Sequence, residues 1–141
     1  MVEKDKLLGY DCDVPFYSNQ FIPLINNADL LDRIELQGKF DKLFSGGAIM
    51  HVNVDNQIDD TDKLIDLINY VIKKGVVYWA INYKLQSDGE HMWVGSDICP
   101  KCGKACTDTY TRVVGFLTNI KNWNKVRREN DFPNRRFYSA V

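Results

Sequence analysis

The sequence predicts an α/β fold that contains one βαβ unit. Residues 48–54 alternate as in a strand, residues 59–75 have the periodicity and the ends of a helix, and residues 76–83 form a second β-prone run. A strand, a helix and a strand in this order usually give parallel strands joined by a right-handed crossover. One such unit leaves sheet edges uncovered, so we expect further strands to complete the sheet.

Composition places the chain among ordinary soluble proteins. It has 141 residues, 45% hydrophobic and 26% charged, which is enough for one domain with a core. No apolar run approaches the roughly 20 residues that span a bilayer, and residues 1–6 lack the apolar core of a secretory signal. We therefore expect a cytoplasmic protein with no membrane association.

The first part of the chain is predicted to hold one helix. Residues 1–28 show little periodicity, and residues 10–25 are predicted to be extended, with a short strand at 21–25. Residues 29–44 carry apolar side chains at helical spacing, and Asn27 or Asp29 can cap the helix by accepting a backbone N–H bond. Gly38 is the position at which this helix is expected to break.

The βαβ unit follows. In the strand at 48–54, His51 lies on the face opposite Met50 and Val52. Such a histidine is usually a core or edge residue satisfied by a hydrogen bond, and the alternative is that it lines an active site. The helix begins with acidic residues and ends at Lys73, Lys74 and Gly75, as the helix dipole and a glycine cap favour. Residues 84–98 are polar and are predicted to form a loop.

Three of the four cysteines lie within eight residues of one another, which favours metal binding over disulfide formation in a cytosolic protein. Cys99 and Cys102 have the spacing that lets two thiolates reach one tetrahedral ion. A complete zinc site needs four ligands, and His91 and Cys106 are the candidates that would give a Cys₃His set. An unmetallated turn is the alternative, and no role is expected for Cys12.

The C-terminal segment is basic and aromatic. Residues 101–141 carry nine Lys/Arg and three Asp/Glu, whereas residues 1–100 carry nine and sixteen. Cations interleaved with rings at 121–128 and 133–138 can bind phosphates and stack on bases. Alternatively, the rings pack the segment onto the body and the cations pair with acidic groups. The net charge of −1 argues against nucleic acid.

One glycine stands alone in an apolar, β-prone run, Gly115 within residues 111–117. It is either a strand glycine at a bulge or close approach, or a glycine whose α-carbon holds an unpaired electron. Such a radical is stabilised by the flanking amide and carbonyl and must be planar, which a β-carbon would hinder. It also needs shelter from oxygen, which Val113, Val114, Phe116 and Leu117 are suited to provide.

Several short segments occur in an order and spacing that resemble one family. They are Arg112-Val113-Val114-Gly115-Phe116-Leu117, Trp123-Asn124-Lys125, Arg127-Arg128-Glu129, Phe16-Tyr17-Ser18-Asn19, Glu35-Leu36-Gln37, Phe44-Ser45-Gly46-Gly47 and Cys99-Pro100-Lys101-Cys102-Gly103. From about residue 10 to 138, the chain resembles the C-terminal glycyl-radical portion of the anaerobic (class III) ribonucleoside-triphosphate reductases.

This resemblance implies a partial barrel-type sheet with a βαβ unit, followed by a cysteine knuckle and a C-terminal glycyl-radical loop. Residues 1–98 would be the C-terminal part of the α/β reductase barrel, and residues 99–141 would hold the knuckle, the radical loop and the basic tail. Gly115 would carry the radical after a separate activase, which uses S-adenosylmethionine and an iron–sulfur cluster, removes a hydrogen atom. The radical would then oxidise a cysteine to a thiyl, which attacks a ribonucleotide.

Two departures from the family pattern matter. Similar proteins supply an upstream cysteine pair to the zinc site, and residues 84–91 contain no cysteine. The thiyl-forming cysteine of the family lies upstream of the matched region, so we expect no activity without a larger reductase subunit, whether from a split gene or a truncation. The alternatives are a zinc-stapled nucleic-acid-binding module and a radical-replacement subunit for another glycyl-radical enzyme.

Overall fold

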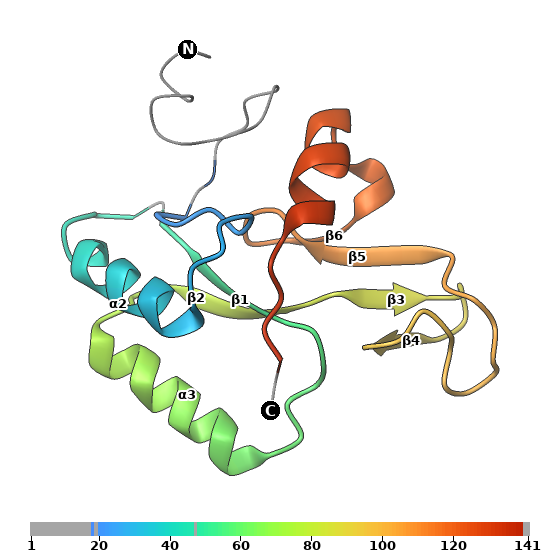
Figure 1. The fold of residues 1–141 in the computed structure, drawn as a ribbon, viewed down its shortest axis with the longest axis horizontal. Helices are drawn as coiled ribbons and strands as arrows, with labels where there is room; N and C mark the ends of the chain where they lie inside the picture. The colour runs from blue at the N-terminus through green and yellow to red at the C-terminus, as the bar shows by residue number, and fades with distance from the viewer. Residues whose placement is uncertain (1–17, 19, 47, 140–141) are drawn as a thin grey trace.

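The computed structural model describes residues 18, 20–46 and 48–139 (Figure 1). Cys12 and residues 10–17 and 19 of the segment predicted to be extended at 10–25 lie outside the described residues. The elements are, in chain order, α2 Leu30–Asp41, β1 Met50–Val54, α3 Thr61–Lys74, β2 Trp79–Tyr83, β3 Leu85–Ser87, β4 Met92–Val94, β5 Asp108–Arg112 and β6 Leu117–Asn119. Three short helical turns follow, η1 Ile120–Asn122, η2 Arg127–Asp131 and η3 Phe132–Asn134.

The predicted βαβ unit is confirmed. Strands β1 and β2 are parallel, in register from Met50 opposite Trp79 to Val54 opposite Tyr83, and α3 connects them. The Asp60 carboxylate accepts the backbone N–H groups at the start of α3, and Gly75 ends the helix in the left-handed region at φ 85°. Helices α2 and α3 lie on one side of these strands (Figure 1).

Helix α2 is shorter than predicted at its C-terminal end, and Gly38 does not break it. A β-carbon on Gly38 would overlap the backbone carbonyl of Lys74 at the end of α3, so the glycine permits close helix packing. Asp29 stands at the start of α2, but its side chain makes no cap. Its Oδ1 instead pairs with Arg136, 3.1 Å away, in the C-terminal segment.

Two local predictions are wrong. The segment at 84–98 is not a loop, because β3 and β4 form an antiparallel hairpin there and β3 also pairs with β5. That second pairing joins residues more than 20 positions apart, which local sequence polarity does not reveal. Residues 21–25 form a turn rather than a strand, closed by the Asn26 N–H bond to the Pro23 carbonyl at 2.9 Å.

The partial barrel-type sheet was predicted together with the βαβ unit, and no barrel is seen in the part of the chain that the structure describes. It contains a two-stranded parallel sheet, β1-β2, and a four-stranded antiparallel sheet in the order β4-β3-β5-β6. The C-terminal segment covers the free edge of β1, where Tyr138 bridges Val54 in parallel and its N–H bonds to the Asn53 carbonyl at 2.9 Å. The parallel sheet alone is too small to close on itself.

The main core lies between the parallel strands and the two helices. It is made of buried residues from α2, β1, α3 and the turn before β2: Ile34, Met50, Val52, Val54, Val71 and Val76. All five residues of β1 are buried, so this strand is covered on both faces. Among the described residues, the helices are too short or too polar to cross a bilayer.

Candidate functional site

Gly115 lies in the loop of a β-hairpin. Strands β5 and β6 pair antiparallel, and the last paired residues are Arg112 and Leu117. Residues 113–116 form the connection between the two strands. Gly115 therefore lies in a loop, and the interpretation of this residue as a strand glycine is wrong. The cysteines precede β5 in the chain and the Gly115 loop follows it. The loop and the cysteines therefore lie at opposite ends of this strand (Figure 1).

Neither backbone conformation nor packing requires a glycine at this position. Gly115 is not among the residues with positive φ, unlike Gly75 and Gly103 at φ 85° and 74°. A β-carbon built on Gly115 would meet only the Tyr78 hydroxyl within 4 Å, at an ordinary 3.7 Å. An alanine would therefore fit, in contrast to Gly38. The usual structural reasons for glycine do not apply here.

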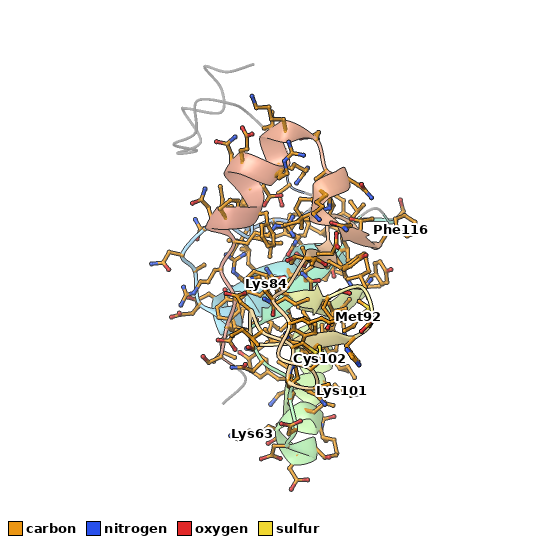
Figure 2. The ribbon with its side chains drawn as sticks, turned by 90° about the vertical axis from the view of Figure 1, so that its right-hand side faces the viewer. Lys63, Lys84, Met92, Lys101, Cys102 and Phe116 are labelled. Atoms are coloured by element: carbon orange, nitrogen blue, oxygen red, sulfur yellow. The ribbon has the colours of Figure 1, made fainter. Side chains whose placement is uncertain are left out.

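The expectation that the neighbouring side chains bury the loop is wrong for this chain alone. Gly115 is half-buried, while Val114 and Phe116 are 44% and 76% exposed. Phe116 is labelled in Figure 2, at the outer edge of that view. Val77 and Tyr78, just before β2, are 76% and 58% exposed. The loop and the start of β2 thus leave apolar side chains exposed in this chain.

A set of hydrogen bonds fixes the base of the hairpin. The Arg112 guanidinium donates to the Gly115 carbonyl, and the Arg112 N–H donates to Asn82 Oδ1 at 3.1 Å. The Arg112 carbonyl accepts from Arg135 Nη1 at 2.5 Å. Arg135 is itself held by two bonds to the buried Asp131, 2.7 and 2.8 Å long. Arg112 is therefore anchored through its backbone on both sides.

Asn82 joins this base to the parallel sheet. It donates to Asn53 Oδ1 at 2.7 Å and accepts from Thr111 Oγ1 at 3.1 Å, and all three residues are at most 1% exposed. Asn53 in turn donates to the Arg136 carbonyl at 3.1 Å. Buried amides that are fully paired specify one arrangement of the elements around them. This network was not predicted from the sequence, in which two asparagines within otherwise apolar strands were the available signal.

His51 is buried, 1% exposed, on β1. Its backbone N–H donates to Gln20 Oε1 at 3.1 Å, and its ring Nδ1 lies 3.4 Å from Gln20 Nε2. Burial and the nearby Arg135 and Arg112 charges lower the pKa of His51 to about 4, whereas the Val114 backbone opposes this shift. The ring is therefore neutral near pH 7. The structure shows His51 as a buried core residue, and the alternative that it lines an active site stays a prediction.

The cysteine turn brings a metal-type donor set together. One ligand atom each from Asp88, His91, Cys99 and Cys102 lies within 4.8 Å of the others. Cys106 is not part of this group, and its thiol donates to the Asp108 carbonyl at 3.2 Å. Figure 2 labels Cys102, on the end of the molecule that faces the viewer.

Two tight turns present these donors. Gly103, at φ 74°, closes the first turn, in which the Gly103 N–H donates to the Cys99 carbonyl at 2.9 Å. The second is the β3–β4 turn, in which the His91 N–H donates to Asp88 Oδ1 at 2.7 Å. Asp88 and His91 have the same spacing as Cys99 and Cys102. That spacing was the signal for Asp88, which was not predicted as a ligand.

The electrostatics of the cluster depend on one carboxylate. Cys102 Sγ donates to Asp88 Oδ2 at 2.9 Å, which raises the pKa of Cys102 to about 11. The same bond, with the His91 and Glu90 N–H groups, lowers the pKa of Asp88. Two thiols, an imidazole and a carboxylate suit tetrahedral Zn²⁺, whose ligand atoms stand roughly 3–4 Å apart. The donor set therefore fits zinc, and binding would release the thiol protons.

Two arginines and three aromatic rings of the basic tail make contacts within the chain. The Arg135 guanidinium stacks on Trp123, 4.8 Å from the ring centre, and Trp123 meets Phe132 edge to face. Arg136 pairs with Asp29 and lies over the Tyr138 ring. Trp123 is only 7% exposed. These contacts favour a segment that packs onto the body over a nucleic-acid surface.

Comparisons with known proteins identify one family. A family profile described as anaerobic ribonucleoside-triphosphate reductase matches residues 1–138. A solved anaerobic ribonucleotide reductase is 37% identical with a TM-score of 0.80, over 99% of this chain and 23% of that one. The Thermotoga maritima enzyme in complex with dATP and CTP is 39% identical with a TM-score of 0.70, over 90% and 21%. A comparison with curated proteins found no match.

The match is strong over this chain, although the chain spans less than a quarter of the length of the reductases. The family profile covers nearly all of the sequence, and the identity to solved relatives exceeds a third. The chain belongs to the anaerobic ribonucleoside-triphosphate reductase family.

Proposed function

We propose that this chain is the glycyl-radical-bearing part of an anaerobic ribonucleoside-triphosphate reductase, with Gly115 as the radical residue. The observation that carries the proposal is that nothing in the fold demands a glycine at 115. A residue without a side chain is then explained by chemistry at its α-carbon. Membership of the reductase family supports the same assignment.

The chemistry starts with the loss of one hydrogen atom from the Gly115 α-carbon to a separate activase that uses S-adenosylmethionine. The radical next takes a hydrogen atom from a cysteine thiol of the larger reductase portion. This restores the Gly115 C–H bond and leaves a thiyl, which abstracts the 3′-hydrogen of a ribonucleotide before the 2′-hydroxyl is lost. Formate or a thioredoxin-like thiol would supply the two electrons of the reduction. The product is a deoxyribonucleotide.

The larger reductase subunit would cover the loop. Val114 and Phe116 flank Gly115 in the chain and are exposed, and so is Tyr78, whose hydroxyl would lie 3.7 Å from a β-carbon on Gly115. A radical needs a dry site, so this apolar surface would have to be covered. In a parallel pair, alternate residues of β2 direct their backbone groups away from β1. Strands of the larger subunit can add at this edge and complete the barrel to which residues 1–98 would belong.

Zinc would have a structural role. Asp88, His91, Cys99 and Cys102 would hold the ion, and residues 99–141 would then form the knuckle, radical loop and tail of the enzyme. The cluster precedes β5 and the Gly115 loop follows it, so the five residues of β5 separate them. Metal at this distance does not touch the reacting atoms. It would fix the start of β5 and thereby the position of the hairpin.

Anaerobic activation tests the proposal. The chain, the larger subunit and the activase are combined without oxygen, and an electron paramagnetic resonance signal is recorded. A radical at Gly115 predicts a doublet, and subsequent exposure to oxygen should cut the chain at Gly115 into two fragments of defined mass. Gly115→Ala should show neither. An uncut chain, or a signal that persists in Gly115→Ala, would contradict the assignment.

A further inference from the structure

The cluster that would hold zinc combines three kinds of donor atom. Two cysteines offer sulfur, a histidine offers nitrogen and an aspartate offers carboxylate oxygen, and one such atom from each lies within 4.8 Å of the others: Cys99, Cys102, His91 and Asp88. An all-cysteine structural site offers four sulfurs instead. The metal preference of this cluster rests on the zinc site of the proposed function, but not on a radical at Gly115.

Asp88 is held so that one of its oxygens faces the other donors. Its side chain is only 1% exposed. Asp88 Oδ1 accepts two backbone N–H groups of its own turn, from Glu90 at 2.9 Å and from His91 at 2.7 Å. Asp88 Oδ2 accepts from Cys102 Sγ at 2.9 Å. The two backbone bonds thus fix the carboxylate and occupy Oδ1, which leaves Oδ2 as the oxygen that can bind a metal.

His91 stands at a ligand-to-ligand distance from Asp88. Its ring Nδ1 lies 3.3 Å from Asp88 Oδ2. Bonds of about 2.0 Å from one tetrahedral zinc ion to a nitrogen and an oxygen place those two atoms roughly 3.3 Å apart. The β3–β4 turn therefore holds this nitrogen and this oxygen at the separation that a shared ion needs.

The surroundings of the cluster hold its two turns together and leave the donors accessible. Glu90, the other carboxylate beside His91, is outside the group of ligand atoms found among the described residues. Its Oε2 accepts from Lys104 Nζ at 3.0 Å, an ion pair that joins the β3–β4 turn to the cysteine turn. Cys102 is exposed, and a cleft of about 240 Å³ borders His91 and Cys99. Ions can therefore reach the donors from solvent.

The metal preference of a site follows the softness of its donors. Polarisable thiolate sulfur favours soft ions, whereas imidazole nitrogen and carboxylate oxygen favour borderline and hard ions. Zn²⁺ is borderline and binds all three donor types, while Cd²⁺ is larger and softer. We propose that Asp88 and His91 make this cluster selective for Zn²⁺ over Cd²⁺, with Asp88 as a ligand through Oδ2 alone. Both ions bind as divalent cations, so exchange of one for the other involves no oxidation or reduction.

Exchange dialysis against both ions tests this selectivity. The full chain, kept reduced and free of oxygen, is dialysed against buffered Zn²⁺ and Cd²⁺ at equal free concentrations, and elemental analysis measures how much of each is bound. The comparison protein is the double variant Asp88→Cys/His91→Cys, which offers four sulfurs at the same spacing. Glu90→Gln is the matched control, since it removes a carboxylate of the same turn that pairs with Lys104 instead.

Wild type and Glu90→Gln should bind more zinc than cadmium. The ratio of bound cadmium to bound zinc should be about tenfold or more higher in the double variant, because sulfur replaces the oxygen and the nitrogen. Substitution with Co²⁺ gives a second measurement. The thiolate-to-cobalt charge-transfer band of wild type should have about half the intensity of that of the double variant, since two thiolates bind the ion instead of four.

Equal ratios of the two metals in wild type and the folded double variant would overturn the proposal while leaving the zinc site in place. If the double variant does not fold, Asp88→Cys alone makes the comparison, with one added thiolate. A cobalt band of three-thiolate intensity in wild type would place Cys106 in the site and overturn the role of Asp88. A wild-type chain that binds neither ion would overturn the zinc site of the proposed function, whereas the radical at Gly115 is tested separately.

Discussion

A β-carbon placed on Gly115 would lie 3.7 Å from the Tyr78 hydroxyl, an ordinary van der Waals separation. Gly115→Ala should therefore fold with a free energy of unfolding within ~0.5 kcal/mol of wild type. Gly38→Ala should lose about 3 kcal/mol or more, because its methyl group would overlap the Lys74 carbonyl where α2 meets α3. Urea unfolding of both variants checks this, and a strongly destabilised Gly115→Ala would restore a structural reason for the glycine.

Zinc content tests the donor set. Purified wild-type protein should contain about one zinc ion per chain, and Asp88→Ala or His91→Ala should lose most of it, because four ligands complete a structural site. Cys106→Ala should keep its metal, since its thiol faces the Asp108 carbonyl instead. Elemental analysis measures the content. Loss of zinc from Cys106→Ala together with its retention in Asp88→Ala would favour the Cys₃His set expected from the sequence.

Lowering the pH should reduce the free energy of unfolding through the protonation of His51. Its pKa of about 4 in the folded protein lies below the 6.5 of an exposed histidine, because burial and two arginines disfavour the charged ring. As the pH falls from 6.5 to 4, the unfolded chain takes up a proton that the folded chain resists. The stabilisation present above pH 6.5 is thus lost, by about 3 kcal/mol.

Comparison with His51→Gln isolates this effect from that of the carboxylates. The variant lacks the titrating ring, so the difference in unfolding free energy between it and wild type should shift in favour of the variant as the pH is lowered. Urea titrations at pH 7, 6 and 5 give the two curves. Parallel curves would mean that His51 titrates normally.

The buried amide of Asn82 should be essential to the hairpin. Asn82→Ala would leave Asn53 Oδ1, Thr111 Oγ1 and the Arg112 N–H without their partner, and should cost about 3 kcal/mol. Asn122→Ala, at an exposed position, is the control and should change little. Amide hydrogen exchange in β5 and β6 should accelerate in Asn82→Ala beyond the global change. Equal stability of the two variants would rule out this role for Asn82.

Local sequence patterns predicted the elements that are specified by neighbouring residues in the chain. The acidic start and glycine end of α3 and the alternation in β1 gave the βαβ unit, and the spacing of Cys99 and Cys102 located the metal-type cluster. The hairpin of β3 and β4 was not predicted, because its strands are polar and β3 is held by pairing with β5, far along the chain. Gly38 was taken for a helix breaker because only the packed structure shows what α3 places beside it.

In the candidate site, too, local patterns could be predicted and tertiary contacts could not. Asp88 was missed because a carboxylate is an uncommon partner of thiols in a zinc turn, although its spacing from His91 repeats that of the cysteines. The exposure of Val114 and Phe116 could not be predicted from their hydrophobicity, since exposed and buried apolar residues look alike in a sequence. The contacts of Arg112 with Gly115, Asn82 and Arg135 likewise arise only from the tertiary fold.

The most direct test of the central claim is electron paramagnetic resonance of the activated complex made with ordinary glycine and with glycine deuterated at its α-carbon. A radical on Gly115 predicts a doublet from the one remaining α-hydrogen, and collapse of that doublet to a narrow single line after deuteration. No signal, or a signal whose splitting is unchanged by the deuterated glycine, would contradict a radical on the Gly115 backbone.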